Sequence, residues 1–313
     1  MAPLLTLLTD FGTEDYYVAA VKGTVLRLAP GTQLVDLSHQ VEPGNIAAGA
    51  FLLAAAFPAF PAGTVHLAVV DPGVGSRRRI LVAERAAGTL GAGASLASAG
   101  DGGSAGAGPG TDAGTGADGG AAADGGAGAD GGGGADGAGG SCLLAPDNGL
   151  LTPLLAGARV RSVEREDLYL DGPGATFHGR DRFAPVAAFL LRGGSPAELG
   201  PEIGDPVQLR GTPPRREPGL LSGTVVHIDR FGNLVTDIPA TWLPPADAVV
   251  APVAARVGSH TTALLAGHYD EIPRHGVALL VGSLRTLELS MRGEHLARRW
   301  AVESGDAVLV RWR

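Results

Sequence analysis

The sequence has little cysteine, no excess of basic residues and no long hydrophobic run, and each absence excludes a class of protein. Its 313 residues contain a single cysteine, Cys142. One cysteine cannot form an intramolecular disulfide and cannot build a cysteine-based zinc cluster unaided. We therefore expect a protein of the reducing cytoplasm.

Basic residues are outnumbered, with 24 Lys and Arg against 32 Asp and Glu and a formal net charge of −8. Six of the acidic residues lie between positions 91 and 140, and without them the net charge is −2. A nearly neutral remainder has no general basic field to attract a polyanion. This balance argues against nucleic acid as the main partner.

The longest apolar run extends from Ile46 to Phe57. It has about half of the ~20 residues that a membrane-spanning helix needs, so we expect a buried helix there and no membrane partner. The start of the chain lacks a basic segment and reaches Asp10 too early for a secretory signal. These features favour a cytoplasmic location.

Glycine is the most unevenly distributed residue. Positions 91–140 hold 22 of the 50 glycines and contain no Lys, Arg, Trp, Tyr, Phe, Ile or Val. Such a stretch cannot bury enough apolar surface to offset the entropy lost on ordering, so we predict that residues 86–140 form a disordered surface loop. Aspartates recur every six positions in it, whereas calcium-binding β-rolls need a nine-residue period with an apolar residue in each repeat.

The first ninety residues alternate short apolar runs with helical patterns. This alternation is typical of βαβ units and predicts a mostly parallel sheet. In such sheets ligands bind beyond the carboxyl ends of the strands, which is where Asp10 and Asp71 fall. Strands are expected at residues 4–8, 33–37, 64–70 and 80–83, and helices at 17–28 and 45–57.

After the glycine-rich stretch, a strand that begins at Cys142 leads through a turn into a helix, and a second helix is expected at residues 183–191. The passage 211–218 is rich in Pro and Arg, as linkers often are. Short strands separated by turn residues follow, and they predict a small β-barrel or sandwich. We therefore expect an N-terminal α/β domain, residues 1–210, and a C-terminal β-domain, residues 219–313.

Polar residues beside the predicted strands are candidates for a site. Asp10 can cap the next helix, which is common for aspartate, or accept hydrogen bonds from a ribose diol. Asp71 begins a glycine-rich turn that ends in three arginines at 77–79, which can bring a carboxylate and a guanidinium into one pocket. The turn contains no dinucleotide or Walker phosphate motif, and an arginine cluster is also common as a solvated patch.

Two later segments are also candidates. His178 lies beside a glycine before a predicted helix, where histidine can act as a general base or as a hydrogen-bond donor, although a single histidine is more often structural. Asp229 and Asn233 stand four residues apart in a turn that can hold an ammonium and a carboxylate, and that is equally common in plain hairpins. No segment has the spacing of a metal-ligand cluster, so no metal site is expected.

In order and spacing, these motifs together resemble the S-adenosyl-L-methionine (SAM) hydrolases that form adenosine. This family is also called the SAM hydroxide adenosyltransferases and is related to the fluorinase and chlorinase. The matching motifs are T-D-F-G at 9–12, V-V-D-P-G-V-G at 69–75, P-D-N-G-L-L at 146–151, F-H-G-R-D at 177–181 and F-G-N at 231–233. They span most of the chain outside the glycine-rich stretch, so the resemblance covers both predicted domains.

The resemblance implies a seven-stranded N-terminal α/β domain and a C-terminal β-barrel. It also implies a homotrimer with three sites, each between the N-terminal domain of one subunit and the C-terminal domain of a neighbour. The family's hydrolytic triad corresponds here to Asp71, Arg78 and His178. Because Arg77 and Arg79 flank the matched arginine, the assignment can shift by one position in either direction.

The substrate-binding residues that the resemblance implies come from both domains. They are Asp10 for the ribose, Asp229 and Asn233 for the methionine end, and the further contacts Asn148, Phe231, Tyr269 and Ser283. Tyr269 is a candidate for stacking on adenine. Ser283 follows Gly282, where the family pattern has asparagine, so the contacts of this turn differ from that pattern.

The implied reaction is hydrolysis of SAM to adenosine and L-methionine, with water attacking C5′ in line with the sulfonium. Because methionine leaves as a neutral thioether, no general acid is needed, and the difficulty lies in activating the water. Arg78 and the sulfonium both favour negative charge on the attacking oxygen. SAM and water are the expected partners, and no metal or redox cofactor is expected.

Two alternatives remain open from the sequence. A SAM-dependent halogenase, which uses fluoride or chloride at the same carbon, fits the extra loop at 86–140, but an Asp–Arg–His triad holds water and repels halide. A non-catalytic module that binds SAM or a nucleoside needs Asp10, Asp229 and Asn233 but not the triad. The resemblance implies that the family's halogenases lack this triad, and the low-complexity composition of the loop suggests drift and not a shaped element, so we favour the hydrolase.

Overall fold

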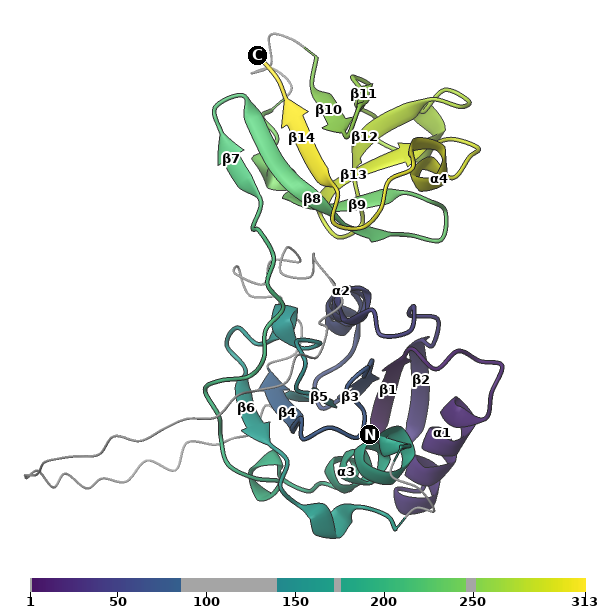
Figure 1. Cartoon of the computed structure of the whole chain (residues 1–313), viewed down its shortest axis with the longest axis vertical. Coiled ribbons are helices and arrows are strands. Elements are labelled where there is room, and N and C mark those ends of the chain that lie inside the picture. The colour runs from purple at the N-terminus through teal and green to yellow at the C-terminus, as the bar shows by residue number, and fades with distance from the viewer. Residues whose placement is uncertain (1, 86–139, 172–175, 246–251) are drawn as a thin grey trace, which may run out of the picture.

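The computed structural model describes residues 2–85, 140–171, 176–245 and 252–313. The predicted disordered loop at 86–140 therefore lies outside the described residues, apart from Gly140. Two sheets organise the chain, one in the N-terminal part and one in the C-terminal part (Figure 1).

The N-terminal sheet has the strand order β2-β1-β3-β5-β4-β6. Its strands are β1 (Leu4–Thr9), β2 (Gln33–Ser38), β3 (Val65–Val69), β4 (Ile80–Arg85), β5 (Ser141–Pro146) and β6 (Arg159–Ser162). The predicted α/β class is confirmed, and the described residues form six strands where the resemblance implies seven.

The sheet is mixed, because one strand runs against its neighbours. Strands β2, β1, β3 and β5 are parallel, whereas β4 pairs antiparallel with both β5 and β6. The connection between β3 and β4 spans residues 70–79 and contains no helix. Parallel strands are usually connected through a helix. The connection at 70–79 has none, so the chain reverses its direction there, and the turn lies at the carboxyl end of β3.

Helices cover both faces of this sheet (Figure 1). Helices α1 (Tyr17–Leu28) and α3 (Ala184–Leu191) pack on each other and on one face, around buried residues such as Leu7, Val25 and Phe183. Helix α2 (Ile46–Ala56) packs on the other face, in the part of the molecule that faces the C-terminal sheet. Its side-chain cap is Asn45, whose Oδ1 accepts a hydrogen bond from the Ala48 N–H at 2.9 Å.

The C-terminal sheet is a nearly closed antiparallel β-barrel in the order β11-β10-β14-β8-β9-β13-β12, with β7 added beside β8. A bridge between Leu265 and Leu279 brings the segment after β11 beside β12. The elements are β7 (Arg215–Glu217), β8 (Leu220–Ile228), β9 (Leu234–Pro239), β10 (Ala254–Val257), β11 (His260–Thr262), β12 (Val277–Val281), β13 (Thr286–Met291), α4 (Leu296–Trp300) and β14 (Ala307–Arg311).

Some predicted details are wrong. The passage 211–218 is not only a linker, because Arg215–Glu217 forms β7 and pairs with the start of β8. The helix expected after β5 is a single 3-10 turn, Thr152–Leu154, with Pro153 in it. The predicted boundaries of the two domains, 1–210 and 219–313, stay a prediction.

Helix α2 also contacts the barrel. The rings of Phe51 and His227 stack with centroids 4.6 Å apart and an interplanar angle of 18°. Val226 and Val235 of the barrel are buried in the same apolar cluster as Phe51. The two sheets are therefore joined by a small apolar interface. No helix of the described residues is long and apolar enough to cross a membrane.

Candidate active site

Asp71 and Arg78 form a buried ion pair at the end of β3. Nε of Arg78 donates to Oδ1 and Oδ2 of Asp71 at 2.7 and 2.8 Å, and Nη2 donates to Oδ2. The Asp71 and Arg78 side chains are only 4% and 8% exposed. The turn between them is closed by the hydrogen bond from the Val74 N–H to the Asp71 carbonyl, at 3.2 Å, and Gly75 supplies its positive φ of 85°. The short return of the chain therefore builds a paired carboxylate and guanidinium from one segment.

His178 completes the group. Nη2 of Arg78 lies 3.1 Å from Nδ1 of His178, which is 3% exposed. A guanidinium has only donors, so Nδ1 accepts and the neutral imidazole carries its proton on Nε2. The Arg78 guanidinium also lies over the ring of Phe183, with Cζ 5.5 Å from the centroid. The structure thus brings together the three residues of the predicted triad.

The ambiguity among the three arginines is resolved by their contacts. Arg79 turns away from Asp71 and binds Asp147, with Nε 2.7 Å from Oδ2, and Asp205, with Nη1 2.8 Å from Oδ1. Arg77 is exposed on the same turn. Arg78 is therefore the arginine that faces the carboxylate and the imidazole.

Asp10 lies at the end of β1, the strand next to β3. Its Oδ2 accepts a hydrogen bond from the Gly44 N–H at 2.9 Å. Burial raises the pKa of the Asp10 carboxyl above its ordinary value, and the negative charge of Asp71 raises it further, against the lowering effect of the Gly44 hydrogen bond. The two aspartates are thus close enough to interact electrostatically, as their positions after adjacent parallel strands predict.

The segment that carries His178 is packed directly on the loop that follows Asp10. The rings of Phe11 and Phe177 meet edge to face, with centroids 6.1 Å apart. A Cβ at Gly179 would lie 3.2 Å from the Phe11 ring, so glycine allows this close approach. Residues 179–183 form a π-helical turn, a feature that often marks functional sites.

Asn148 supports the same region from the turn after β5. Its side-chain amide donates to the Val70 carbonyl at 2.8 Å, and its Oδ1 accepts from the Leu150 N–H at 3.2 Å. Val70 directly precedes Asp71, so Asn148 fixes the backbone from which that carboxylate extends. Its predicted contact with substrate stays a prediction.

Asp229 and Asn233 form a compact turn after β8. Asp229 Oδ1 accepts hydrogen bonds from the N–H groups of Phe231 and Asn233, both at 2.9 Å, and Oδ2 accepts from Nδ2 of Asn233 at 2.9 Å. Phe231, at the tip, is 76% exposed. Gly232 has a φ of 89°, and a Cβ there would lie 2.7 Å from the backbone of His295. The turn is therefore rigid and presents an aromatic ring to solvent.

Tyr269 lies in the same part of the barrel as Asp229. Its hydroxyl donates to Oε1 of Glu288 at 2.8 Å, while the residue as a whole is 52% exposed. Burial of the hydroxyl and its bond to Glu288 raise the pKa of Tyr269 to about 12, and the charge of Asp229 contributes to the rise. Ser283 is exposed in the turn between β12 and β13. Tyr269 is therefore held by a carboxylate, Glu288, that the sequence reasoning did not find.

The sequence carries only a weak signal for Glu288. It alternates with Leu287 and Leu289 in the strand at 286–290, a pattern that is typical of a charge on a solvent-facing side. The structure buries Glu288 to 6% exposure and gives it two hydroxyl donors, those of Tyr269 and Ser290.

The predicted residues thus form two groups. The predicted catalytic group comprises Asp71, Arg78 and His178 of the α/β part, with Asp10 beside it, and the barrel group comprises Asp229, Phe231, Asn233, Tyr269 and Ser283. The polar contacts of the barrel group given above all lie within the barrel. The catalytic group offers a paired carboxylate, a guanidinium and a ring N–H, which can orient a water molecule and stabilise negative charge.

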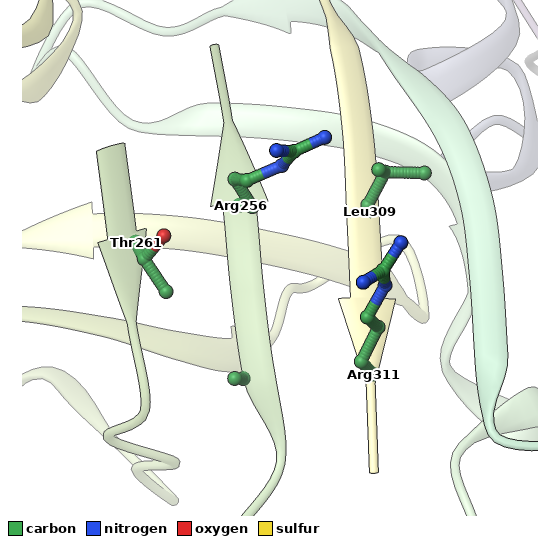
Figure 2. A pocket seen from close by; sticks show the side chains of 5 residues that line it. Arg256, Thr261, Leu309 and Arg311 are labelled. Atoms are coloured by element: carbon green, nitrogen blue, oxygen red, sulfur yellow. The ribbon is translucent and has the colours of Figure 1, made fainter. Parts of the chain in front are cut away.

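A separate hollow of about 210 Å³ lies on the outer face of the barrel. Figure 2 shows Arg256 and Arg311 reaching toward Leu309, with Thr261 on the neighbouring strand. The hollow contains none of the predicted site residues. Within the described ranges, no group of three or more His, Cys, Asp or Glu side chains is arranged to hold a metal ion.

Comparison with known proteins gives the same assignment over both parts of the chain. Residues 5–92 and 124–200 match the SAM hydroxide adenosyltransferase N-terminal domain, and residues 223–309 match the C-terminal domain of that family. The (R)-S-adenosyl-L-methionine hydrolase of Salinispora tropica is 31% identical over 315 residues, covering 98% of this chain and 97% of the relative.

More distant relatives extend the comparison. A fluorinase of an Actinoplanes species is 29% identical over 252 residues, covering 78% of this chain and 74% of that protein. The crystal structure of an uncharacterized conserved protein from Thermotoga maritima superposes with a TM-score of 0.75 at 26% identity, covering 98% of this chain and 99% of the other. With both family domains matched and the hydrolase similar along nearly its whole length, this chain belongs to the SAM hydroxide adenosyltransferase family.

Proposed function

We propose that the protein hydrolyses SAM to adenosine and L-methionine through attack of water on C5′. The observation that carries this proposal is the buried arrangement in which Arg78 bonds to both Asp71 and His178. Its members come from the turn after β3 and from the segment before α3, which are about 100 residues apart in the sequence.

The chemistry requires activation of water and no acid at the leaving group. Water forms a bond to C5′, the C5′–S bond breaks, and its electron pair leaves on the neutral thioether of methionine. One proton is released from the attacking oxygen. Because water has a pKa of about 15.7, a site that orients the molecule and stabilises negative charge on its oxygen lowers the barrier.

Each member of the catalytic group has a defined part. The Asp71 carboxylate accepts a hydrogen bond from the water and orients its lone pair toward C5′. Arg78 holds that carboxylate in place through two donor nitrogens and adds positive charge beside the developing hydroxide. His178 accepts from Arg78 at Nδ1, which fixes the orientation of its ring beside the guanidinium.

The remaining predicted residues bind the substrate. In this proposal Asp10 accepts hydrogen bonds from the ribose, Asn148 contributes from the turn after β5, and the barrel group binds the adenine and methionine ends. Since the barrel group makes its polar contacts within the barrel, we propose that the complete site forms in a homotrimer, between the α/β part of one subunit and the barrel of the next. Light scattering behind a sizing column measures this oligomeric state.

The second candidate is a SAM-dependent halogenase, which the 29% identical fluorinase supports. The contacts of the catalytic group oppose it. A halide site is favoured by an apolar pocket without a carboxylate, and Asp71 places negative charge where the halide would bind. Hydrolysis therefore has the stronger physical support.

The test is to incubate the protein with SAM in 18O-labelled water and to identify the products by liquid chromatography and mass spectrometry. We expect adenosine with one heavy oxygen at C5′ and an equal amount of methionine. Parallel reactions with fluoride or chloride should give the same adenosine. A 5′-halo-5′-deoxyadenosine as the main product would establish the halogenase instead.

The arginine run provides a matched pair of variants. Arg78→Ala removes the guanidinium that bonds to Asp71 and His178, and we expect a loss of at least about a hundredfold in kcat, the effect of removing one charged stabilising group. Arg77→Ala removes an exposed arginine from the same turn and should keep activity within about twofold. Equal activity of the two variants would refute the mechanism.

A further inference from the structure

Glu288 connects two features of the barrel that the proposed function assigns to substrate binding. Its Oε1 accepts hydrogen bonds from the Tyr269 hydroxyl and the Ser290 hydroxyl, both at 2.8 Å. Its Oε2 lies against Gly282, where an added Cβ would approach to 2.8 Å. Glu288 therefore touches both Tyr269 and the turn that carries Ser283.

Burial makes this contact more than a surface hydrogen bond. Glu288 is 6% exposed and Ser290 is fully buried, on the face of β13 opposite to Leu287 and Leu289 of the barrel core. A buried carboxylate without hydrogen bonds is costly, and the tyrosine hydroxyl is one of the two donors that Oε1 receives. Holding the hydroxyl in this place fixes the direction of the Tyr269 ring.

The ring itself faces outward. Tyr269 is 52% exposed, although its hydroxyl is bound to the buried carboxylate of Glu288. Phe231, on the turn of Asp229, is also strongly exposed, and Asp229 is near enough to Tyr269 to contribute to its raised pKa. An exposed aromatic ring fixed at its polar end is suited to stack on a planar base, because little entropy is lost on binding.

Two backbone hydrogen bonds and the Glu288 carboxylate also fix the turn at 282–285. The Gly282 N–H donates to the Thr286 carbonyl at 2.9 Å, and the Arg285 N–H donates to the Gly282 carbonyl at 3.0 Å. Arg285 has a φ of 59°, a conformation that is uncommon for a residue with a side chain. The Glu288 carboxylate fills the space beside Gly282, so it supports the backbone that presents Ser283.

We propose that Glu288 is a positioning residue for the substrate, which sets the Tyr269 ring and the Ser283 turn for binding the adenosine part of SAM. This inference rests on the proposed function, because it assigns the same barrel group to substrate. It adds a residue that is not part of the catalytic group and predicts that substrate affinity, rather than the chemical step, depends on it.

The test is a double-mutant cycle in KM for SAM, with Tyr269→Phe, Glu288→Leu and the double variant. Tyr269→Phe removes the hydroxyl and keeps the ring, so it releases the ring with little risk to folding. We expect KM to rise about fivefold in Tyr269→Phe and at least as much in Glu288→Leu, with kcat within about threefold of the original. In the double variant KM should equal that of Glu288→Leu, because both changes break the same contact.

Two further variants separate positioning from general stability. Glu288→Gln keeps an oxygen that can accept from both hydroxyls, so it should restore most of the affinity lost in Glu288→Leu. Asp237→Leu removes another buried carboxylate of the barrel, one that accepts hydrogen bonds from Thr224. It should lower Tm while leaving KM unchanged.

Several outcomes would overturn the inference. They are an unchanged KM in Tyr269→Phe, additive effects in the double variant, or a KM rise in Asp237→Leu as large as in Glu288→Leu. Calorimetric titration with adenosine measures the same cycle as Kd without turnover. If the unaltered protein releases no adenosine from SAM, the proposed function fails, whereas the adenosine Kd values still support or refute the role of Glu288.

Discussion

His66 makes the stability of the protein depend on pH in a way that can be calculated. It lies in β3, fully buried, with Nδ1 2.8 Å from the Thr6 hydroxyl and its ring beside those of Phe57 and Phe60. Burial lowers the pKa of His66 from 6.5 to about 4. The unfolded chain therefore binds a proton at a pH where the folded chain does not.

The sign and size follow from linkage. A lowered histidine pKa means that the unfolded state gains protons first, so stability falls as the pH drops below about 6.5 and stops falling below about 4. Between pH 7 and pH 5 the loss from this one residue is about 2 kcal/mol, and over the whole range it is about 3 kcal/mol. These are large fractions of a typical unfolding free energy.

The assay is urea unfolding of the original protein and of His66→Asn from pH 7.5 to pH 5. This range extends to both sides of the ordinary histidine pKa of about 6.5, below which the unfolded chain takes up a proton. Asparagine keeps a polar atom near Thr6 but does not titrate. The variant should be less stable at pH 7 because of the space it leaves, and its disadvantage should shrink by about 2 kcal/mol at pH 5. A constant difference between the two proteins across this range would refute the reasoning.

Three further changes test the site and the interface between the two sheets. Asp71→Ala should abolish adenosine release while Kd for SAM, measured by calorimetry, stays within about tenfold, because the carboxylate acts on water. Full activity in that variant would contradict the mechanism. Gly232→Ala should lower Tm and raise KM, since a Cβ at a φ of 89° would also strike the His295 backbone; unchanged values would show that the turn adapts. Phe51→Ala should reduce the free energy of unfolding by about 3–5 kcal/mol in urea titrations, because it removes a buried ring and its stacking on His227. A loss below about 1 kcal/mol would mean that the interface contributes little.

Strongly patterned elements could be predicted from the sequence. The helix expected at 17–28 is found at Tyr17–Leu28, and the strand expected at 33–37 is found at Gln33–Ser38. Both are bounded by residues that end regular structure. The direction of β4 could not be predicted, because an apolar run carries no information on which neighbour it pairs with. That choice depends on the length of the connection and on β5 and β6, which come much later in the chain.

The site, too, could be predicted only in part, because some of its contacts join residues that are far apart in the sequence. Asp10 and Asp71 could be found because strand ends of a parallel sheet are known places for ligands. The sequence could not show which of three consecutive arginines faces Asp71, because that depends on Asp147 and Asp205, which bind Arg79. Glu288 was missed because its partner Tyr269 lies 19 residues away in the sequence.

The opposite directions of Arg78 and Arg79 restrict the length of the chain between β3 and β4. Arg78 faces Asp71 and His178, while Arg79 is held by Asp147 and Asp205, so neighbouring guanidinium groups serve separate partners. Loss or gain of one residue in this turn would exchange the two positions and break both sets of contacts at once. Apart from Asp71 and the two arginines, this segment should therefore tolerate substitutions far better than changes in its number of residues.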